Sequence, residues 1–114
     1  MTASTPLQAF KAEFFKALGH PLRIRILEVL VGGERSVQEL QEALDLDQPI
    51  VSQHLAMLRA KSIVKARKEG TTVRYAIRDV SIGELLMVAR RIVDSQLIDA
   101  QSMLRELRRG GRRR

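Results

Sequence analysis

The stretch that decides the fold is DQPIVSQHLAMLRA, residues 47–60. Asp47 is a residue type that caps helices, and Pro49 is tolerated only in the first turn of a helix. Apolar residues then recur at helical spacing and predict one buried side. Its members are Val51, Leu55 and Leu58, with Ile50, His54 and Met57 beside them.

The other side of this helix is polar. It carries Gln48, Ser52, Gln53 and Arg59, whose side chains can hydrogen-bond base edges or phosphates. Two interpretations are open at this point: a helix that reads a nucleic acid, or an ordinary amphipathic surface helix. The neighbouring sequence separates them.

A second, short helix is predicted immediately upstream. Ser36 and Glu39 have the spacing of a capping box, in which the serine hydroxyl accepts the Glu39 amide and the glutamate side chain accepts the Ser36 amide. This helix is expected to end near Leu44, before a turn around Leu46. Two helices joined by a three- or four-residue turn, the second polar on its outer side, form a helix-turn-helix.

Downstream, residues 63–68 and 72–77 flank the turn Glu69-Gly70-Thr71 and predict a two-stranded hairpin. Apolar and basic residues alternate along both segments, so one side of the hairpin is expected to lie on the helical core and the other to be basic. The tip is then free to reach a phosphate backbone or a minor groove.

The ends of the chain predict further helices. A helix over 7–18 places Phe10 and Phe14 on one stripe, and Gly19-His20-Pro21 separates it from a helix over 21–31 with Arg23 and Arg25 pointing outward. A second capping-box pattern at Ser81–Glu84 opens a last helix that stays amphipathic for about 25 residues, roughly 38 Å.

A small domain cannot cover both ends of so long an apolar stripe, so a homodimer is expected through the two terminal helices. The expected division is a flexible arm (1–6), one domain with terminal dimerisation helices (7–108) and a basic tail (109–114). The predicted dimerisation residues are Phe10, Phe14, Leu85, Val88, Ile92, Leu97 and Leu104.

Composition and charge narrow the classes of function. The 114 residues are 45% hydrophobic and 29% charged, as in a soluble globular protein, and they contain no 18-residue apolar run, no secretory signal pattern and no cysteine. We therefore expect a cytoplasmic protein with no membrane segment. Of the net charge of +7, residues 48–78 contribute +6 and the last ten residues +5, against −4 elsewhere, which favours a polyanionic partner.

Two segments together resemble a known family: ALGHPLRIRILEVL (17–30) and VSQHLAMLRAKSIVKARKEGTTVRYAI (51–77). The chain is similar over about 14–79 to the ArsR/SmtB family of bacterial winged helix-turn-helix repressors. The resemblance implies a mainly α (α+β) fold with helices 1–4, a two-stranded wing and a long C-terminal dimerisation helix. The chain departs from the family at residues 60–63, where AKSI replaces the usual A-G-L, and at Gly70-Thr71, where a basic residue commonly follows the wing glycine.

By position, the resemblance implies that Gln48, Pro49, Ser52 and Gln53 face the major groove, with Ser52 and Gln53 contacting base edges or nearby phosphates. Pro49 stands where the family often has a hydrogen-bonding residue. Phosphate contacts supply affinity but little sequence information. The implied candidates on the helix end and the wing are Arg59, Lys65, Arg67, Lys68, Thr71 and Arg74.

Familiar members of the family leave DNA when they bind a metal, but their ligands are mostly missing here. Cysteine sites are impossible, and of the site on the last helix only Asp79 remains, with Ile92 and Ser95 at the later positions. His20 is expected to be a cap or core-edge residue, and His54 to pack or contact DNA. No cofactor is evident and no metal site is predicted; a metal is possible, but the usual ligands of the family are absent. The weak candidates, Asp79, Glu84, Asp94 and Asp99, could place carboxylates between subunits, although acids on an exposed helix are usually just solvated.

The function expected is that of a homodimeric, sequence-specific repressor on double-stranded DNA, occupying an inverted-repeat operator with half-sites about one helical turn apart. Release is expected from an effector or from a separate metal- or ligand-sensing protein. The alternative is a non-specific nucleic-acid-binding or architectural protein. An enzyme is not expected, because no Ser/His/Asp set, glycine-rich phosphate loop or cysteine nucleophile is visible.

Overall fold

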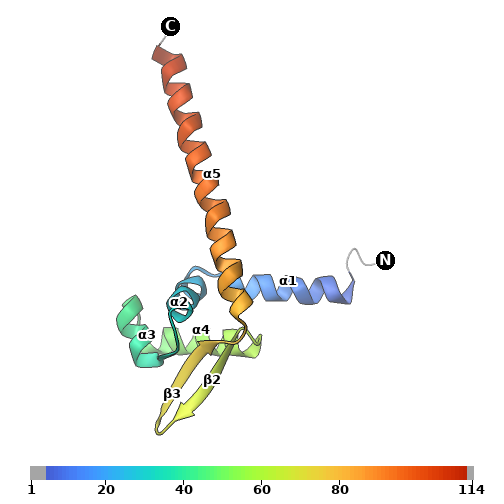
Figure 1. The fold of residues 1–114 in the computed structure, drawn as a ribbon, viewed down its shortest axis with the longest axis vertical. Helices are drawn as coiled ribbons and strands as arrows, with labels where there is room; N and C mark the ends of the chain where they lie inside the picture. Colours follow the sequence, from blue (N-terminus) through green and yellow to red (C-terminus); the bar gives the residue numbers. More distant parts are fainter. Residues whose placement is uncertain (1–4, 113–114) are drawn as a thin grey trace. The chain divides into compact units, whose positions relative to one another are not determined.

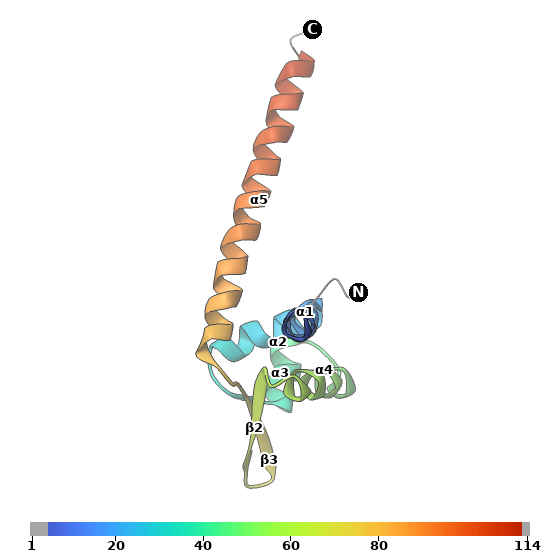
Figure 2. The same cartoon turned by 90° about the vertical axis from the view of Figure 1, so that its right-hand side faces the viewer.

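The computed structural model describes residues 5–112, which divide into two compact units, one that ends at Gly83 and one that begins at Glu84. The first unit contains the predicted helix-turn-helix followed by the hairpin (Figures 1 and 2). The elements in chain order are α1 (Pro6–Leu18), α2 (Pro21–Val31), β1 (Arg35–Ser36), α3 (Val37–Leu44), α4 (Gln48–Ala60), β2 (Val64–Glu69), β3 (Thr72–Ile77) and α5 (Val80–Arg112).

The core of the first unit lies where α4 packs against α2, α3 and β2. Val51, Leu55 and Leu58 of α4 are fully buried, as predicted from their spacing. Their neighbours are other fully buried apolar side chains, which pack closely around them. These are Ile26 and Leu27 of α2, Leu40 of α3, and Ile63 and Val64 at the start of β2.

Both ends of α4 are fixed by local backbone interactions. Asp47 stands at the N-cap as predicted, although its side chain makes no capping hydrogen bond. At the other end, the amide of Ile63 donates to the Leu58 carbonyl at 2.9 Å and that of Ser62 to the Arg59 carbonyl at 3.0 Å. This is a Schellman arrangement, and it requires the left-handed φ of +59° seen at Ser62.

The sheet has three strands, whereas the sequence predicted two. The strand order is β1-β3-β2, with Arg35 opposite Tyr75 and Ser36 opposite Arg74. A two-residue edge strand has no periodicity of its own, so sequence patterns do not detect it. Ser36 also forms the predicted capping box: its amide donates to Glu39 at 2.9 Å, and its hydroxyl accepts the Glu39 amide at 3.1 Å.

The arginines of α2 were expected to point outward: Arg25 is exposed and Arg23 is half-buried, and both bond to a neighbouring helix. Arg23 Nε donates to the Ala17 carbonyl at 2.6 Å, and Arg25 Nη2 donates to the Leu44 carbonyl at 2.9 Å. Both carbonyls lie at helix C-termini, where the backbone has unpaired acceptors and a partial negative charge. These two arginines therefore hold α1 and α3 onto α2.

His54 of α4 is buried and lies against His20, with the ring centroids 4.4 Å apart. His20 caps α2, as expected, by accepting the Leu22 amide on Nδ1 at 3.1 Å. His54 Nδ1 has no hydrogen-bond partner among the described residues. Burial, and secondarily the charges of His20 and Arg23, lower the pKa of His54.

The terminal helices are longer than predicted. Helix α1 begins at Pro6, because Thr5 and Gln8 form a capping box, and residues 1–4 of the expected arm lie outside the described residues. Helix α5 begins after Asp79, whose carboxylate accepts the Ser81 amide at 2.9 Å, so the expected Ser81 capping box is wrong. It continues through Arg112, where a basic tail was expected from 109.

We expect Leu55→Ala to lower the free energy of unfolding by about 2–5 kcal/mol, because it removes a fully buried side chain from tightly packed surroundings. Urea denaturation at one fixed chain concentration measures this. The control is Met57→Ala on the same helix, where 43% of the residue is exposed and the loss should stay below about 1 kcal/mol. Equal losses for the two variants would contradict this view of the core.

The lowered pKa of His54 predicts that the free energy of unfolding decreases as the pH is lowered. The unfolded chain takes up a proton near the ordinary histidine pKa of about 6.5, whereas the folded chain resists it. Stability is therefore complete above about pH 6.5 and declines as the pH falls from there towards the lowered pKa. His54→Leu should make urea midpoints less dependent on pH between 7.5 and 5.

His20→Asn is the matched control, because asparagine keeps a capping acceptor while removing the other histidine. This variant should keep most of the pH dependence, since burial is the main cause of the His54 shift. An unchanged pH dependence in the His54→Leu protein would refute the assignment.

Candidate nucleic-acid interface

The turn of the helix-turn-helix sets the direction in which α4 leaves α3. Three residues, 45–47, join the two helices, and Asp45 adopts a left-handed conformation at φ 54° and ψ 53°. Because the opposite side of α4 is locked in the core, its polar side is displayed to solvent. Gln48, Pro49, Gln53 and Arg59 are exposed, and Ser52 is half-buried.

Two of the residues predicted to face DNA are bonded to each other. Gln48 Nε2 donates to the Ser52 hydroxyl at 2.7 Å, one helical turn apart. The serine hydroxyl therefore keeps its proton available for an outside acceptor, while the glutamine is held along the helix. Gln53 makes no side-chain hydrogen bond within residues 5–112.

The buried side of α4 is narrower than predicted. Ile50 and Met57 were expected beside the core, yet 37% and 43% of these residues are exposed. The side therefore consists of Val51, Leu55 and Leu58 with His54, and the two remaining apolar side chains lie at the edges of the polar surface.

The register of the hairpin separates its two faces. Val64 pairs with Ile77 and Ala66 with Tyr75 on one face, whereas Arg67 pairs with Arg74 on the other. Alternation had predicted these two faces. Lys68 differs, because its register partner is Val73 and it follows Ala66 on the apolar face, near the exposed tip. The turn residue Thr71 is exposed as well.

The arginine pair of the hairpin is held by carboxylates of the same chain. Arg67 bonds Glu34, and its Nη2 lies 2.9 Å from Glu69 Oε2. Arg74 Nη2 donates to Glu39 Oε1 at 3.0 Å, and its Nε lies 3.5 Å from Glu34 Oε1 and 3.8 Å from Glu69 Oε2. We call these five side chains, Glu34, Glu39, Arg67, Glu69 and Arg74, the wing cluster.

Interactions in the wing cluster shift the pKa of three of its members, Glu34, Glu39 and Arg67. The hydrogen bond from Arg67 is the main cause that lowers the pKa of Glu34, and the same bond raises the pKa of Arg67. The Ser36 amide is the main cause that lowers the pKa of Glu39, with Arg74 contributing further. With three carboxylates and two guanidinium groups, the cluster carries a formal net charge of −1.

The cluster reduces the basic surface that the sequence had suggested. Of the basic residues between 48 and 78, Lys61 lies 3.7 Å from Glu13, and Arg67 and Arg74 are paired in the wing cluster. The others form no ion pair within the described part of the chain. They are Arg59, Lys65, Lys68 and Arg78, and all four are exposed.

Glu34 was missed by sequence reasoning. It follows Gly32-Gly33 and has no motif of its own, and its arginine partner lies 33 residues away in the chain. Its neighbour in the cluster, Glu39, was found only as a capping residue. The register pair Arg67–Arg74 on a basic strand face was the one signal that acids should gather nearby.

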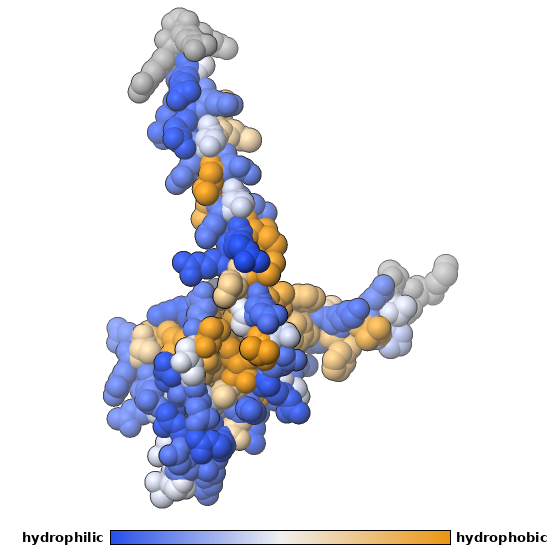
Figure 3. Space-filling model, viewed as in Figure 1, coloured by the Kyte–Doolittle hydropathy of each residue, from blue (hydrophilic) through white to orange (hydrophobic). Residues whose placement is uncertain are grey.

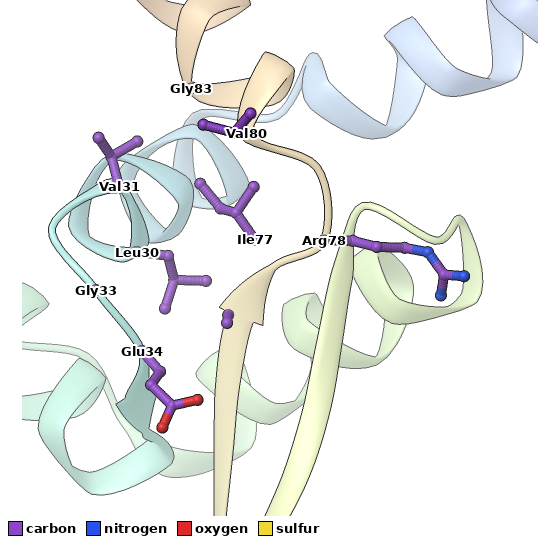
Figure 4. A pocket seen from close by; sticks show the side chains of 9 residues that line it. Leu30, Val31, Gly33, Glu34, Ile77, Arg78, Val80 and Gly83 are labelled. Carbon is purple, nitrogen blue, oxygen red and sulfur yellow. The ribbon is translucent and has the colours of Figure 1, made fainter.

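A pocket of about 390 Å³ lies beside the wing cluster, between the end of α2 and β3. Figure 4 shows Leu30, Val31, Ile77 and Val80 around it, with Glu34 at one side and the Arg78 side chain pointing away. Ala76, Gly33 and Gly83 complete the lining. The pocket is therefore apolar, with one carboxylate on its wall.

The predicted dimerisation residues expose apolar surface in the single chain. On α1, Phe10 is 77% exposed and Phe14 half-buried. In the second unit, Leu85 is half-buried, and Val88, Ile92, Leu97 and Leu104 are exposed along α5. Figure 3 shows hydrophobic residues along parts of both helices, whereas the hairpin is largely hydrophilic.

Among residues 5–112 of this single chain, no group of three or more His, Cys, Asp or Glu side chains is arranged to hold a metal ion. Of the weak candidates, Asp79 accepts the Ser81 amide, which lowers the pKa of its carboxyl, and Asp94 lies 3.9 Å from Arg90. Glu84 lies exposed at the start of the second unit. Within the described residues, no helix is sufficiently long and apolar to span a membrane.

Comparison with known proteins agrees with this geometry. The model of the bacterial regulatory protein arsR family matches residues 20–66. An HTH-type transcriptional regulator of Mycobacterium tuberculosis, Rv0081, is 47% identical over 109 residues, which cover 95% of this chain and 96% of that protein. A probable mercury resistance operon repressor of Streptomyces lividans is 39% identical over 79 residues, 69% of this chain and 63% of that protein.

Solved structures match in the same way. The crystal structure of Rv0081 superposes with a TM-score of 0.78 at 47% identity, covering 84% of this chain and 97% of that one. The homodimeric winged helix-turn-helix DNA-binding domain of Mb0332 from Mycobacterium bovis, solved by NMR, superposes with a TM-score of 0.74 at 29% identity, covering 85% and 94%. The chain therefore belongs to the ArsR family of bacterial regulatory proteins and is a winged helix-turn-helix transcriptional regulator.

Proposed function

We propose that the protein is a homodimeric repressor that binds an inverted-repeat operator, with α4 of each subunit in the major groove and the β2–β3 wing on the flanking backbone. Repression follows from occupation of the promoter. The observation that carries this proposal is the pairing of a locked apolar side on α4 with a displayed side of Ser52 and Gln53.

Sequence discrimination is assigned to Ser52 and Gln53, with Gln48 holding the serine hydroxyl in place. Gln53 is exposed and unbonded within the described residues, so its amide is available to both a donor and an acceptor on a base edge. Pro49, one helical turn before Gln53, can make only apolar contact at its own position. Thr71 at the wing turn and Arg59 at the end of α4 are positioned for backbone contacts in this arrangement.

Affinity is assigned mainly to the basic residues that form no ion pair within the described chain. Arg59, Lys65 and Lys68 fit this role, because a cation that is already neutralised releases few additional counterions on binding a phosphate. Arg67 and Arg74, which the sequence also suggested, are held by carboxylates in the unbound chain.

Support for the homodimer comes from the exposed apolar residues of α1 and α5 and from the homodimeric relative of Mycobacterium bovis. Apolar surface of this extent is costly in water and typical of an interface. Phe10 and Phe14 on α1, and Leu85, Val88, Ile92, Leu97 and Leu104 on α5, are the proposed contacts. Two subunits also match an operator of two half-sites.

Derepression in this proposal needs an effector or a separate sensing protein that binds the off-DNA form better than the DNA-bound form. Asp79, the one residue retained from the family's metal site on the last helix, already has its carboxylate engaged as a helix cap. We therefore propose a non-metal effector or a partner sensor as the source of release.

The proposal is tested with a duplex selected from a random pool by the purified protein. The selected duplex should bind at least about 10³-fold more tightly than random duplex at the same salt concentration. Ser52→Ala combined with Gln53→Ala should remove this preference, because the groups that discriminate between bases are lost. Fluorescence anisotropy with both duplexes measures the ratio.

The chain supplies a matched control in Ser95–Gln96, the same dipeptide exposed on α5. Ser95→Ala with Gln96→Ala should leave the ratio unchanged. Light scattering should report twice the chain mass of 12.9 kDa for both double variants. A Ser52/Gln53 variant that still selects its duplex would place the reading surface elsewhere, and a ratio near one in the unaltered protein would favour the architectural alternative.

Lys68→Ala should weaken binding to selected and random duplexes alike, because a phosphate contact carries no sequence information. The slope of log K against log salt should become shallower by about 0.9 for each lysine that contacts a phosphate. Lys11→Ala on α1 changes the net charge equally and serves as the control. A loss confined to the selected duplex would indicate a base contact instead.

A further inference from the structure

The wing cluster joins the hairpin to the segment that precedes α3. Glu34 contacts both arginines, although it lies 33 residues before Arg67 in the chain. Both of its oxygens meet the Arg67 guanidinium, Oε2 at 3.4 Å. This is the geometry in which a guanidinium also receives two oxygens of a phosphate.

The three carboxylates of the cluster differ in what else they hold. Glu39 also accepts the Ser36 amide in the capping box, so its position is set by α3. Glu69 lies on the same strand, β2, as its partner Arg67. Glu34 alone reaches the wing from another element without forming part of a cap, and it bonds the two arginines at once.

The contacts of Glu34 are accessible from outside the protein. The side chains of Glu34 and Arg67 are 34% and 54% exposed, so solvent screens their attraction and a competing anion can reach it. A DNA phosphate that approaches the wing therefore has to displace a carboxylate that already accepts the hydrogen bonds of the guanidinium.

We propose that Glu34 is an internal competitor for the DNA backbone: its carboxylate occupies Arg67 and Arg74 and so restrains the binding of the wing to any duplex. The inference rests on the proposed DNA-binding function and adds a residue that does not touch DNA. Its consequence is weaker binding to random DNA, where phosphate contacts supply nearly all the affinity.

The expected size of the effect follows from counterion release. Each arginine that gains a phosphate contact steepens the slope of log K against log salt by about 0.9, and the corresponding gain in affinity at 0.1 M salt is about eightfold. Glu34→Gln keeps the shape of the side chain and removes its charge. Arg67 then retains one carboxylate partner, Glu69, so at most about one contact per subunit is gained, which is about two per dimer, and the eightfold figure applies to each contact.

The experiment measures the affinity of the full chain for a random duplex between 50 and 200 mM NaCl. Glu34→Gln should bind it several-fold more tightly at 0.1 M salt than the unaltered protein, with a steeper salt dependence. Glu28→Gln is the matched control: Glu28 is exposed on α2, forms no ion pair with a described residue, and its substitution changes the net charge equally. Any excess over this control comes from the wing cluster.

In an Arg67→Ala background, Glu34→Gln should lose most of its excess over the control, since the released cation is absent. An effect of Glu34→Gln equal to that of Glu28→Gln, or weaker binding than the unaltered protein, overturns the proposal; the latter would mean that Glu34 serves only to position the wing. Circular dichroism checks that the variants fold. If the Glu34→Gln protein does not fold, Glu34→Ala takes its place, with the same expected change in affinity.

Failure of the proposed function looks different. In that case the unaltered protein shows no preference between the selected and random duplexes, whatever Glu34 does. If the preference is present and Glu34→Gln has no excess effect, the function stands and only the role of Glu34 is wrong.

Discussion

Burial of one side of α4 is the constraint on which the rest of this structure depends. Val51, Leu55 and Leu58 are enclosed by α2, α3 and the start of β2, and a helix rotated about its axis would bring polar residues into that core. Rotation of α4 is thereby excluded. Ser52 and Gln53 face outward because the apolar residues on the opposite side of the helix are held in the core. The turn at Asp45 and the Schellman arrangement at Ser62 fix the two ends of the same helix.

The wing shows how formal charge differs from charge available to a partner. The strand register gathers Arg67 and Arg74 on one face, and at that density of positive charge the acids nearby are drawn into ion pairs. Exposed pairs of this kind contribute little to stability. Their effect on a polyanion is larger, because they decide which cations can still release counterions.

The helices α1 and α5 carry apolar residues that the core of the single chain does not bury. Helix α1 buries Ala17 and Leu18 at its end and leaves Leu7 and Phe10 exposed. Helix α5 keeps helical periodicity over many turns, and most of its apolar residues after Leu86 are exposed. Such a distribution is unfavourable in an isolated chain, and it favours association through these two helices.

The sequence alone determined the local features of this protein, because they depend on residues within a few positions of one another. These features are the capping box at Ser36 and Glu39, the helical period of α4, and the glycine turn between β2 and β3. The helical period placed Ser52 and Gln53 on the polar side of α4, and the family resemblance singled them out as candidate reading residues. Other features were decided only by tertiary structure. The pairing of β1 with β3, the arginine contacts to helix C-termini and the neutralisation of Arg67 and Arg74 by Glu34 and Glu39 join residues far apart in the chain. Such contacts depend on how complete elements pack, and no spacing or periodicity within one segment encodes them.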